Sequence, residues 1–324
     1  MTLELRSYTP GDEQRWDDFC GTSYEGTLLH TRSYLSYHKD RFADKSLMIE
    51  FDGKLVGIFP AAVHHADATC VVSHPGVTYG GVVHSGYLRG SRMIETLTLI
   101  ASRYAKEGFA RLVYKVVPSF YHKAPAEDDV YALHRLGAAL VRCDLSSSIK
   151  LNSRQPESQR RKRGLKKAMK AGFEVREGAQ YLNDLWRVVT DNLQRKHGTK
   201  PVHSVEEIEL LAGKFPSEIR CVVALFEEKV ECGTLIFSTQ AADHAQYIAS
   251  SEVGYAFSGL DAVFEYAISS AITRGKDWFD FGISTEEGGA YLNDGLYNFK
   301  SEFGGGGTVH KFFELQLSGN SLWQ

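Results

Sequence analysis

Alternating apolar and polar residues predict a β-hairpin in each half of the chain. In the first half, residues 46–63 form two such runs on either side of Asp52-Gly53, a dipeptide that favours a tight hairpin turn. In the second half, residues 220–237 form two more runs around a turn at residues 227–229. Two hairpins so far apart in the chain indicate two separate sheets or sheet regions.

The same order of elements follows each hairpin: a strand, a helix that stops at a glycine, and a further strand. These elements are residues 69–73, 91–106 and 112–117 in the first half and 246–250, 260–273 and 278–281 in the second. Gly108 and Gly275 follow the two helices, where a glycine commonly ends a helix. The repetition predicts two α/β domains of shared architecture. Because identity between the halves is low, a coincidence of common α/β order is the alternative.

The composition fits two ordinary domains and restricts the classes of partner. Of 324 residues, 43% are hydrophobic and 24% charged, and the net charge of −3 argues against general nucleic-acid binding while leaving room for one basic groove. We find no signal-peptide pattern, and no apolar run approaches the roughly 18 residues of a membrane span. The five cysteines are scattered and form no CxxC pair, which favours reduced thiols. We therefore expect a cytoplasmic protein.

A basic segment begins the second half. Between residues 154 and 170, eight arginines and lysines stand against one acid, Glu157. Helical spacing places Arg163, Lys167 and Lys170 on one face. One interpretation is a solvated helix face, and the other is a patch that binds phosphates. The anion-binding candidates are Arg160, Arg163 and Lys167 in this segment, Arg195 and Lys196 near the end of a later helix, and Lys39 in the first half.

The chain has its most distinctive stretch at residues 280–307. A strand that ends in Asp280 is followed by a polar, glycine-rich loop, a short segment with one lysine, Lys300, and four consecutive glycines at 304–307. Glycine tolerates sharp bends and close approach to a ligand. Lys300 beside Phe299 sets a positive charge against an apolar wall, although an ordinary solvated lysine is the simpler interpretation.

The stretch around Lys300 carries a family resemblance. GLYNFKSEFGG, residues 295–305, resembles the YGLYxFKxxFGG signature of the Fem family, the FemABX-type aminoacyl-tRNA-dependent peptidyl transferases with tandem GNAT-like domains. The basic segment at 158–168 is similar to the family's inter-domain helix, and residues 27–31 and 73–81 resemble segments of BioF2-like acyltransferases. No long coiled-coil insertion is present, so the shape would match family members without that arm.

The resemblance implies a fold, a reaction and site residues. The fold would be two tandem GNAT-like domains of the α/β (α+β) class, with mixed sheets flanked by helices and a last strand that returns to the first domain. Domain 1 would span residues 1–150 and be completed by 308–324, and domain 2 would span 151–307. Lys300 would handle the tRNA end and the developing negative charge, with Phe299 packed beside it. Tyr79 and Tyr297 would join the residues that bind substrate or tRNA.

Other chemistry is weakly represented in the chain. Asp280 is a candidate general base if the flanking Phe279 and Phe281 raise its pKa, and a structural aspartate that caps the next loop is the alternative. Residues 251–259 do not match the Q/R-x-x-G-x-G/A loop with which GNAT proteins bind the pyrophosphate of acetyl-CoA. The histidines show no HExxH or Cys/His cluster, and we expect no metal and no bound cofactor.

The expected activity is therefore aminoacyl transfer from aminoacyl-tRNA to the amine of a peptide-like acceptor, a cell-wall precursor or a peptide natural product. Direct attack by the amine is simpler than a covalent intermediate, because no Ser-His-Asp order is present. One alternative is a CoA-dependent N-acyltransferase acting on an amino sugar or another small amine. A second is a non-catalytic GNAT repeat that binds RNA or a nucleotide. The sequence names neither the amino acid, nor the acceptor, nor the oligomeric state.

Overall fold

The chain divides into two compact units in a computed structural model, which describes residues 2–318. Unit 1 comprises Met1–Asp144 and Val309–Gln324, and unit 2 comprises Leu145–Thr308. The boundaries expected from the sequence lie near residues 150 and 308. The chain passes from one unit to the other inside two long strands, β8 (Ala139–Lys150) and β16 (Gly306–Gln316). Residues 319–324 of the expected returning segment lie outside the described residues.

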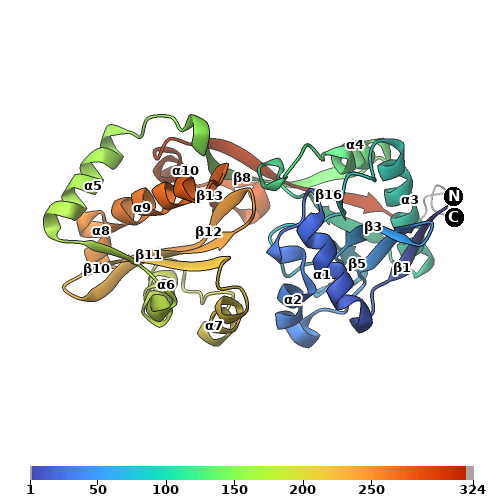
Figure 1. Ribbon diagram of the computed structural model, residues 1–324, viewed down its shortest axis with the longest axis horizontal. Coiled ribbons are helices and arrows are strands. Elements are labelled where there is room, and N and C mark those ends of the chain that lie inside the picture. Colours follow the sequence, from blue (N-terminus) through green and yellow to red (C-terminus); the bar gives the residue numbers. More distant parts are fainter. Residues whose placement is uncertain (1, 319–324) are drawn as a thin grey trace. The chain divides into compact units, whose positions relative to one another are not determined.

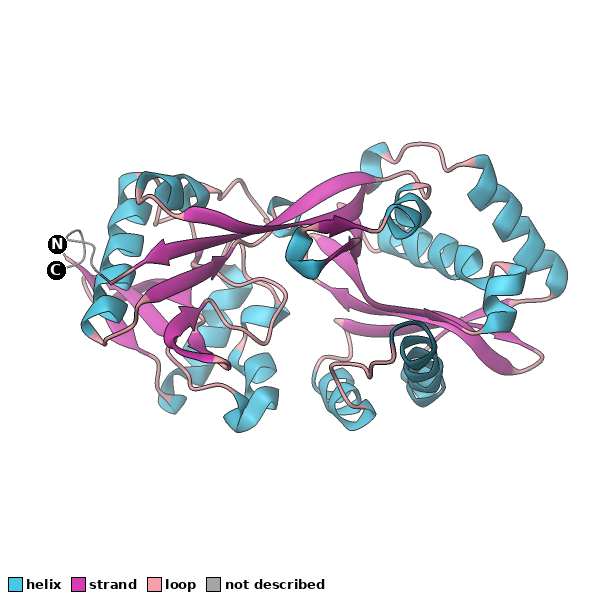
Figure 2. Cartoon of the chain, turned by 180° about the vertical axis from the view of Figure 1, so that it is seen from behind, coloured by secondary structure: helices cyan, strands magenta, loops and turns pink. Residues whose placement is uncertain are grey.

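Unit 1 has two groups of strands and helices packed against them. One group pairs in the order β1-β2-β3-β6 and the other in the order β4-β5-β7-β16. The elements are β1 (Leu3–Ser7), α1 (Glu13–Thr22), α2 (Arg32–Leu35), β2 (Leu47–Phe51), β3 (Lys54–Phe59), β4 (Ala62–His64), β5 (Asp67–Val72), β6 (Val83–His84), α3 (Ser91–Lys106), β7 (Arg111–Lys115) and α4 (Asp128–Arg135). Figure 2 shows these strands and helices by colour.

The first predicted hairpin forms as its sequence requires. Asp52 and Gly53 both have positive φ, 47° and 76°, which is the conformation that an Asp-Gly turn adopts between β2 and β3. The second hairpin has a shorter turn than expected, because β11 already begins at Lys229. Glu227 and Glu228 take positive φ there without the help of a glycine.

Unit 2 is built on one mixed sheet. Its strands pair in the order β8-β13-β12-β11-β10-β9, and β12 and β13 are parallel while the other pairs are antiparallel. The elements are α5 (Gln159–Ala171), β9 (Glu174–Glu177), α6 (Leu182–His197), α7 (Val205–Lys214), β10 (Ile219–Phe226), β11 (Lys229–Ser238), β12 (Ala242–Ser250), α8 (Glu252–Phe257), α9 (Gly259–Thr273), β13 (Trp278–Ile283), β14 (Thr285–Glu286), β15 (Tyr291–Leu292) and α10 (Asp294–Ser301).

Helices cover both faces of the unit 2 sheet. Figure 1 shows α9 on one face and α6 and α7 on the other. On the α9 side, the rings of Phe264, Phe281 and Phe303 lie 4.8–5.4 Å apart in a buried aromatic core. Because successive strand residues point to opposite faces, the side chain between Phe279 and Phe281 lies on the α6 side. That residue is Asp280.

The two units repeat the predicted order, and the last strand returns as expected. The parallel pair β5–β7 of unit 1 corresponds to the parallel pair β12–β13 of unit 2, with α3 and α9 as the connecting helices. β16 pairs antiparallel with β7, from Phe312 opposite Lys115 to Gln316 opposite Arg111. The predicted fold class is confirmed. Within the part of the chain that is described, no helix combines the length and apolarity that crossing a membrane would require.

Candidate functional site

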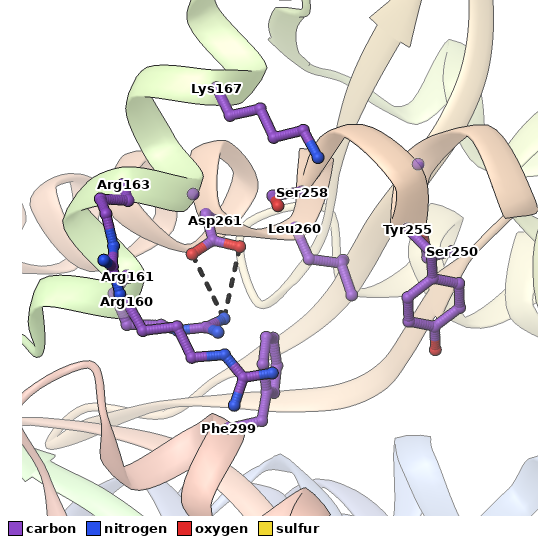
Figure 3. A pocket seen from close by; sticks show the side chains of 12 residues that line it. Arg160, Arg161, Arg163, Lys167, Ser250, Tyr255, Ser258, Leu260, Asp261 and Phe299 are labelled. Carbon is purple, nitrogen blue, oxygen red and sulfur yellow. Dashed lines mark hydrogen bonds and ion pairs between the residues drawn. The ribbon is translucent and has the colours of Figure 1, made fainter.

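A pocket in unit 2 lies where the basic helix α5 meets the start of α9. Ser158 begins α5 by accepting a hydrogen bond from the Arg161 amide, and Gly172 ends it in the left-handed conformation. The helix approaches α9 closely at Gly164, because a Cβ there would lie 2.4 Å from Asp261 Oδ1. This close packing sets the basic side chains of α5 beside the α9 N-terminus (Figure 3).

We call this site the basic pocket, a cavity of about 370 Å³. It is lined by Arg160, Arg161, Arg163, Gly164, Lys167, Ser250, Gly254, Tyr255, Ser258, Leu260, Asp261 and Phe299. Four of these side chains carry a positive charge and one a negative charge. The first turn of α9 adds amide groups at the positive end of a helix dipole. The pocket therefore favours an anion.

Among the cationic residues that line the basic pocket, Arg161 has a structural role. It is buried, its Nη1 lies 3.2 Å from Asp261 Oδ1, and its Nε lies 3.1 Å from Glu302 Oε2. Its guanidinium also lies 4.7 Å from the Phe299 ring centroid. Burial raises the pKa of Asp261 to about 6, and the charge of Arg161 opposes that rise. Arg161 thus fixes α5 to α9 and α10.

The predicted residues Arg160, Arg163 and Lys167 are exposed and line the pocket. Among the described residues they have no carboxylate within ion-pair distance. These three side chains share a cavity with the aromatic rings of Phe299 and Tyr255. Cations together with stacking surfaces are the groups that bind phosphates and bases.

Arg195 and Lys196 contact residues that line the pocket without lining it themselves. Arg195 Nη2 donates to the Ser250 carbonyl at 3.1 Å. Lys196 Nζ lies 4.4 Å from the Tyr255 ring centroid and donates to its hydroxyl. Both cations come from the end of α6, so the structure places them at the β12–α8 side of the pocket.

Lys300 is buried and held in a fixed direction. Asn293 caps α10 by accepting from the Leu296 amide, and two turns later Lys300 is only 4% exposed. Its Nζ donates to the carbonyls of Gly282 and Ile283, at 2.9 and 2.6 Å. Burial lowers the pKa of Lys300 to about 8, and the Asp280 carboxylate acts in the opposite direction. The interpretation of Lys300 as an ordinary solvated lysine does not hold.

The burial of Lys300 predicts a pH effect on stability. Its folded pKa of about 8 lies below the 10.5 of an ordinary lysine, so between these pH values the unfolded chain binds more protons than the folded one. Raising the pH from about 8 to about 10.5 should therefore stabilise the wild type relative to Lys300→Met by about 3 kcal/mol. Urea unfolding of both proteins at several pH values measures this difference. A difference that is constant with pH would contradict a buried, desolvated ammonium.

The remaining predicted residues are not among those that line the basic pocket. Tyr297 is half-buried on α10, with its hydroxyl 3.1 Å from where a Cβ of Gly307 would be. In unit 1, Lys39 is exposed at a residue with φ 51°. Tyr79 is buried there, and its hydroxyl donates to Thr27 Oγ1 at 3.2 Å.

Asp280 is held by hydrogen bonds to neighbouring strands of the sheet. It is 0% exposed, and its Oδ1 accepts hydrogen bonds from the Ser146 and Ser148 hydroxyls at 2.6 and 2.8 Å. Its Oδ2 lies 2.6 Å from His244 Nδ1. The carboxylate therefore joins three strands of the sheet, and this contact with His244 had no signal in the local sequence.

Several lining residues were missed by sequence reasoning. Ser250, Tyr255, Ser258 and Asp261 lie in or directly beside residues 251–259, the segment in which the sequence showed no pyrophosphate-binding pattern. Here α8 occupies that segment, with Ser251 accepting from the Gly254 amide, and it explains why the glycine-rich pattern is absent. An acidic residue in the first turn of a predicted helix is the one signal that could have pointed to Asp261.

Comparison with known proteins gives structural likeness without sequence likeness. No protein-family model matches the chain, and no curated protein matches its sequence. The solved structure of FemX is similar at a TM-score of 0.67 and 12% identity, covering 97% of each chain. The structure of L-PGS from Bacillus licheniformis has a TM-score of 0.62 at 13% identity and covers 98% of this chain and 94% of its own.

A third similar structure is a tandem GNAT protein from the clavulanic acid biosynthesis pathway. Its TM-score is 0.56 at 10% identity, and the match covers 99% of this chain and 100% of that one. At sequence identities this low, the structural likeness establishes the fold alone. The matches nevertheless extend over both units and agree with the repeated strand order described above. The chain has the tandem GNAT fold found in FemX.

Proposed function

We propose that the protein is an acyltransferase that moves an aminoacyl group from aminoacyl-tRNA to the amine of a peptide-like acceptor. The observation that carries this proposal is the basic pocket, in which Arg160, Arg163 and Lys167 line the same cavity as Phe299, the chain neighbour of the buried Lys300. The 3′ end of a tRNA presents phosphates and stackable bases next to its ester. Its phosphates would pair with the three cations, and a base would lie on Phe299 or Tyr255.

Besides a binding site for the donor, acyl transfer requires stabilisation of the developing negative charge, and Lys300 would supply it. When an amine attacks an ester carbonyl, negative charge develops on the carbonyl oxygen, and a fixed donor in a site without water stabilises it. The Lys300 ammonium is directed by two backbone carbonyls and is shielded from solvent. Because such a donor is already oriented, little free energy is needed to reorganise it as the charge develops.

A CoA-dependent N-acyltransferase is the second candidate. The specific observation in its favour is the α9 N-terminus beside the cations, because a helix N-terminus also suits a pyrophosphate. The observation against it is α8, which replaces the glycine-rich loop whose backbone amides would surround that pyrophosphate. Both donors share an adenosine and phosphates, so the choice needs an experiment.

The test is amide formation by the purified protein with radiolabelled aminoacyl-tRNA, prepared from total tRNA, and a small-molecule filtrate of cells as the source of acceptor. Products are measured with and without prior RNase A treatment, and in parallel with acetyl-CoA as the labelled donor. An RNase-sensitive product supports the tRNA-dependent reaction, and the active amino acid identifies the donor. A product that resists RNase and needs acetyl-CoA replaces the proposal with the second candidate.

A further inference from the structure

One histidine on the unit 2 sheet is oriented by a buried carboxylate. His244 on β12 lies opposite Asp280 on the parallel strand β13, and its Nδ1 is 2.6 Å from Asp280 Oδ2. The other oxygen of Asp280 accepts from Ser146 and Ser148 on β8. The His244 side chain is 12% exposed, whereas that of Asp280 is fully buried. The arrangement is fixed by three neighbouring strands, β8, β12 and β13.

The carboxylate determines which nitrogen of the imidazole carries the proton. An ionised carboxylate only accepts hydrogen bonds, so a neutral His244 donates from Nδ1, and its basic lone pair is on Nε2. An imidazole held in this way is prepared to accept a proton at Nε2.

The Nε2 edge of the ring lies next to the residue that holds Lys300. A Cβ at Gly282, where φ is 76°, would be 3.2 Å from His244 Cε1 and 4.0 Å from Nε2. The carbonyl of the same Gly282 accepts from Lys300 Nζ at 2.9 Å. His244 and Lys300 therefore both lie beside Gly282, and this single residue at the end of β13 brings a base close to a cation.

We propose that His244 is the general base of the acyl transfer and that Asp280 is its positioning residue; this inference rests on the proposed function. As the neutral amine forms its bond to the carbonyl carbon, Nε2 takes one proton from the amine nitrogen. The bond between the carbonyl carbon and the 3′ oxygen of the donor then breaks, and the leaving oxygen receives that proton from the imidazolium. The products are an amide and a free 3′ hydroxyl, and the histidine returns to its starting state.

The proposed base is therefore His244 and not Asp280, the candidate that the sequence offered. A side chain that is 0% exposed and already accepts three hydrogen bonds has no access to an incoming amine. His244 is the partly exposed end of the same pair.

The kinetic test compares His244→Gln and His244→Ala with the wild type, using total aminoacyl-tRNA and the cell filtrate. His65→Gln, at an exposed histidine of unit 1, is the control and should match the wild type. His244→Gln should lower the single-turnover rate by about 10²–10⁴-fold, as removal of a general base does, with little change in KM for the donor. Added imidazole should restore part of the rate of His244→Ala.

A spectroscopic test needs no substrate. The ¹⁵N NMR shifts of the His244 ring in the wild type should be those of a neutral Nδ1–H tautomer, and Asp280→Asn should move the proton to Nε2, since an asparagine amide can donate to Nδ1. An Nε2–H tautomer in the wild type would overturn the inference. A single-turnover rate of His244→Gln within twofold of the wild-type rate would also overturn it, as would a rate of His244→Ala that added imidazole does not increase. A wild type that transfers no aminoacyl group overturns the proposed function itself, whatever the tautomer.

Discussion

Replacing Lys300 by alanine is expected to lower kcat/KM for acyl transfer by about 100-fold or more while the protein stays folded. The reason is the environment of the ammonium, which is nearly inaccessible to water and held by the Gly282 and Ile283 carbonyls. In such a site a charge–dipole contact with the developing oxyanion is stronger than in water, and the alanine variant loses it entirely.

Lys276→Ala is the matched control for Lys300→Ala. Lys276 also belongs to unit 2, its pKa is also lowered by burial, and its Nζ also donates to a backbone carbonyl, that of Thr239. It lies outside the residues assigned to the reaction. Circular dichroism and urea unfolding verify that each variant is folded. Activity of Lys300→Ala within a few-fold of Lys276→Ala would remove Lys300 from the mechanism and favour a protein that only binds RNA or a nucleotide.

The architecture was predictable because its signals are local. The Asp52-Gly53 turn and the glycine that ends each long helix depend on the backbone freedom of single residues, which the sequence displays directly. The helix predicted at 91–106 is α3 with the same bounds, Ser91–Lys106. The returning strand β16 is different, since nothing local assigns a strand to a distant partner. Its prediction depended on the resemblance of residues 295–305 to a known family.

The composition of the site was only partly predictable, because its contacts join residues that are far apart in the chain. Arg160, Arg163 and Lys167 were recognisable as a run of charge, but their cavity also needs α9, which α5 approaches closely at Gly164 and Asp261, far apart in the chain. The partners of Asp280 come from β8 and β12, and the register that brings them together is a property of the whole sheet. Local reasoning could offer Asp280 as a base or as a cap, and it had no means of finding His244.

The basic pocket itself predicts the second large effect. Arg160→Gln, Arg163→Gln and Lys167→Gln together should raise the donor KM by roughly 100-fold or more at moderate salt, because each lost cation–phosphate contact removes a charge-assisted hydrogen bond. The maximal rate should change little, since Lys300 and His244 remain in place. The logarithm of affinity should also depend less steeply on the logarithm of salt concentration, by about 0.7 per lost contact with a single strand.

The same helix provides a control of equal charge. Lys162→Gln, Lys166→Gln and Lys170→Gln also remove three positive charges from α5, at residues that do not line the pocket. A general electrostatic attraction of tRNA would make the two triple variants equally weak. A specific pocket makes only the first one weak, because its side chains share a cavity with Phe299 and Tyr255. Filter binding of total tRNA across a salt series separates these outcomes, and equal slopes would assign α5 the role of a solvated basic face.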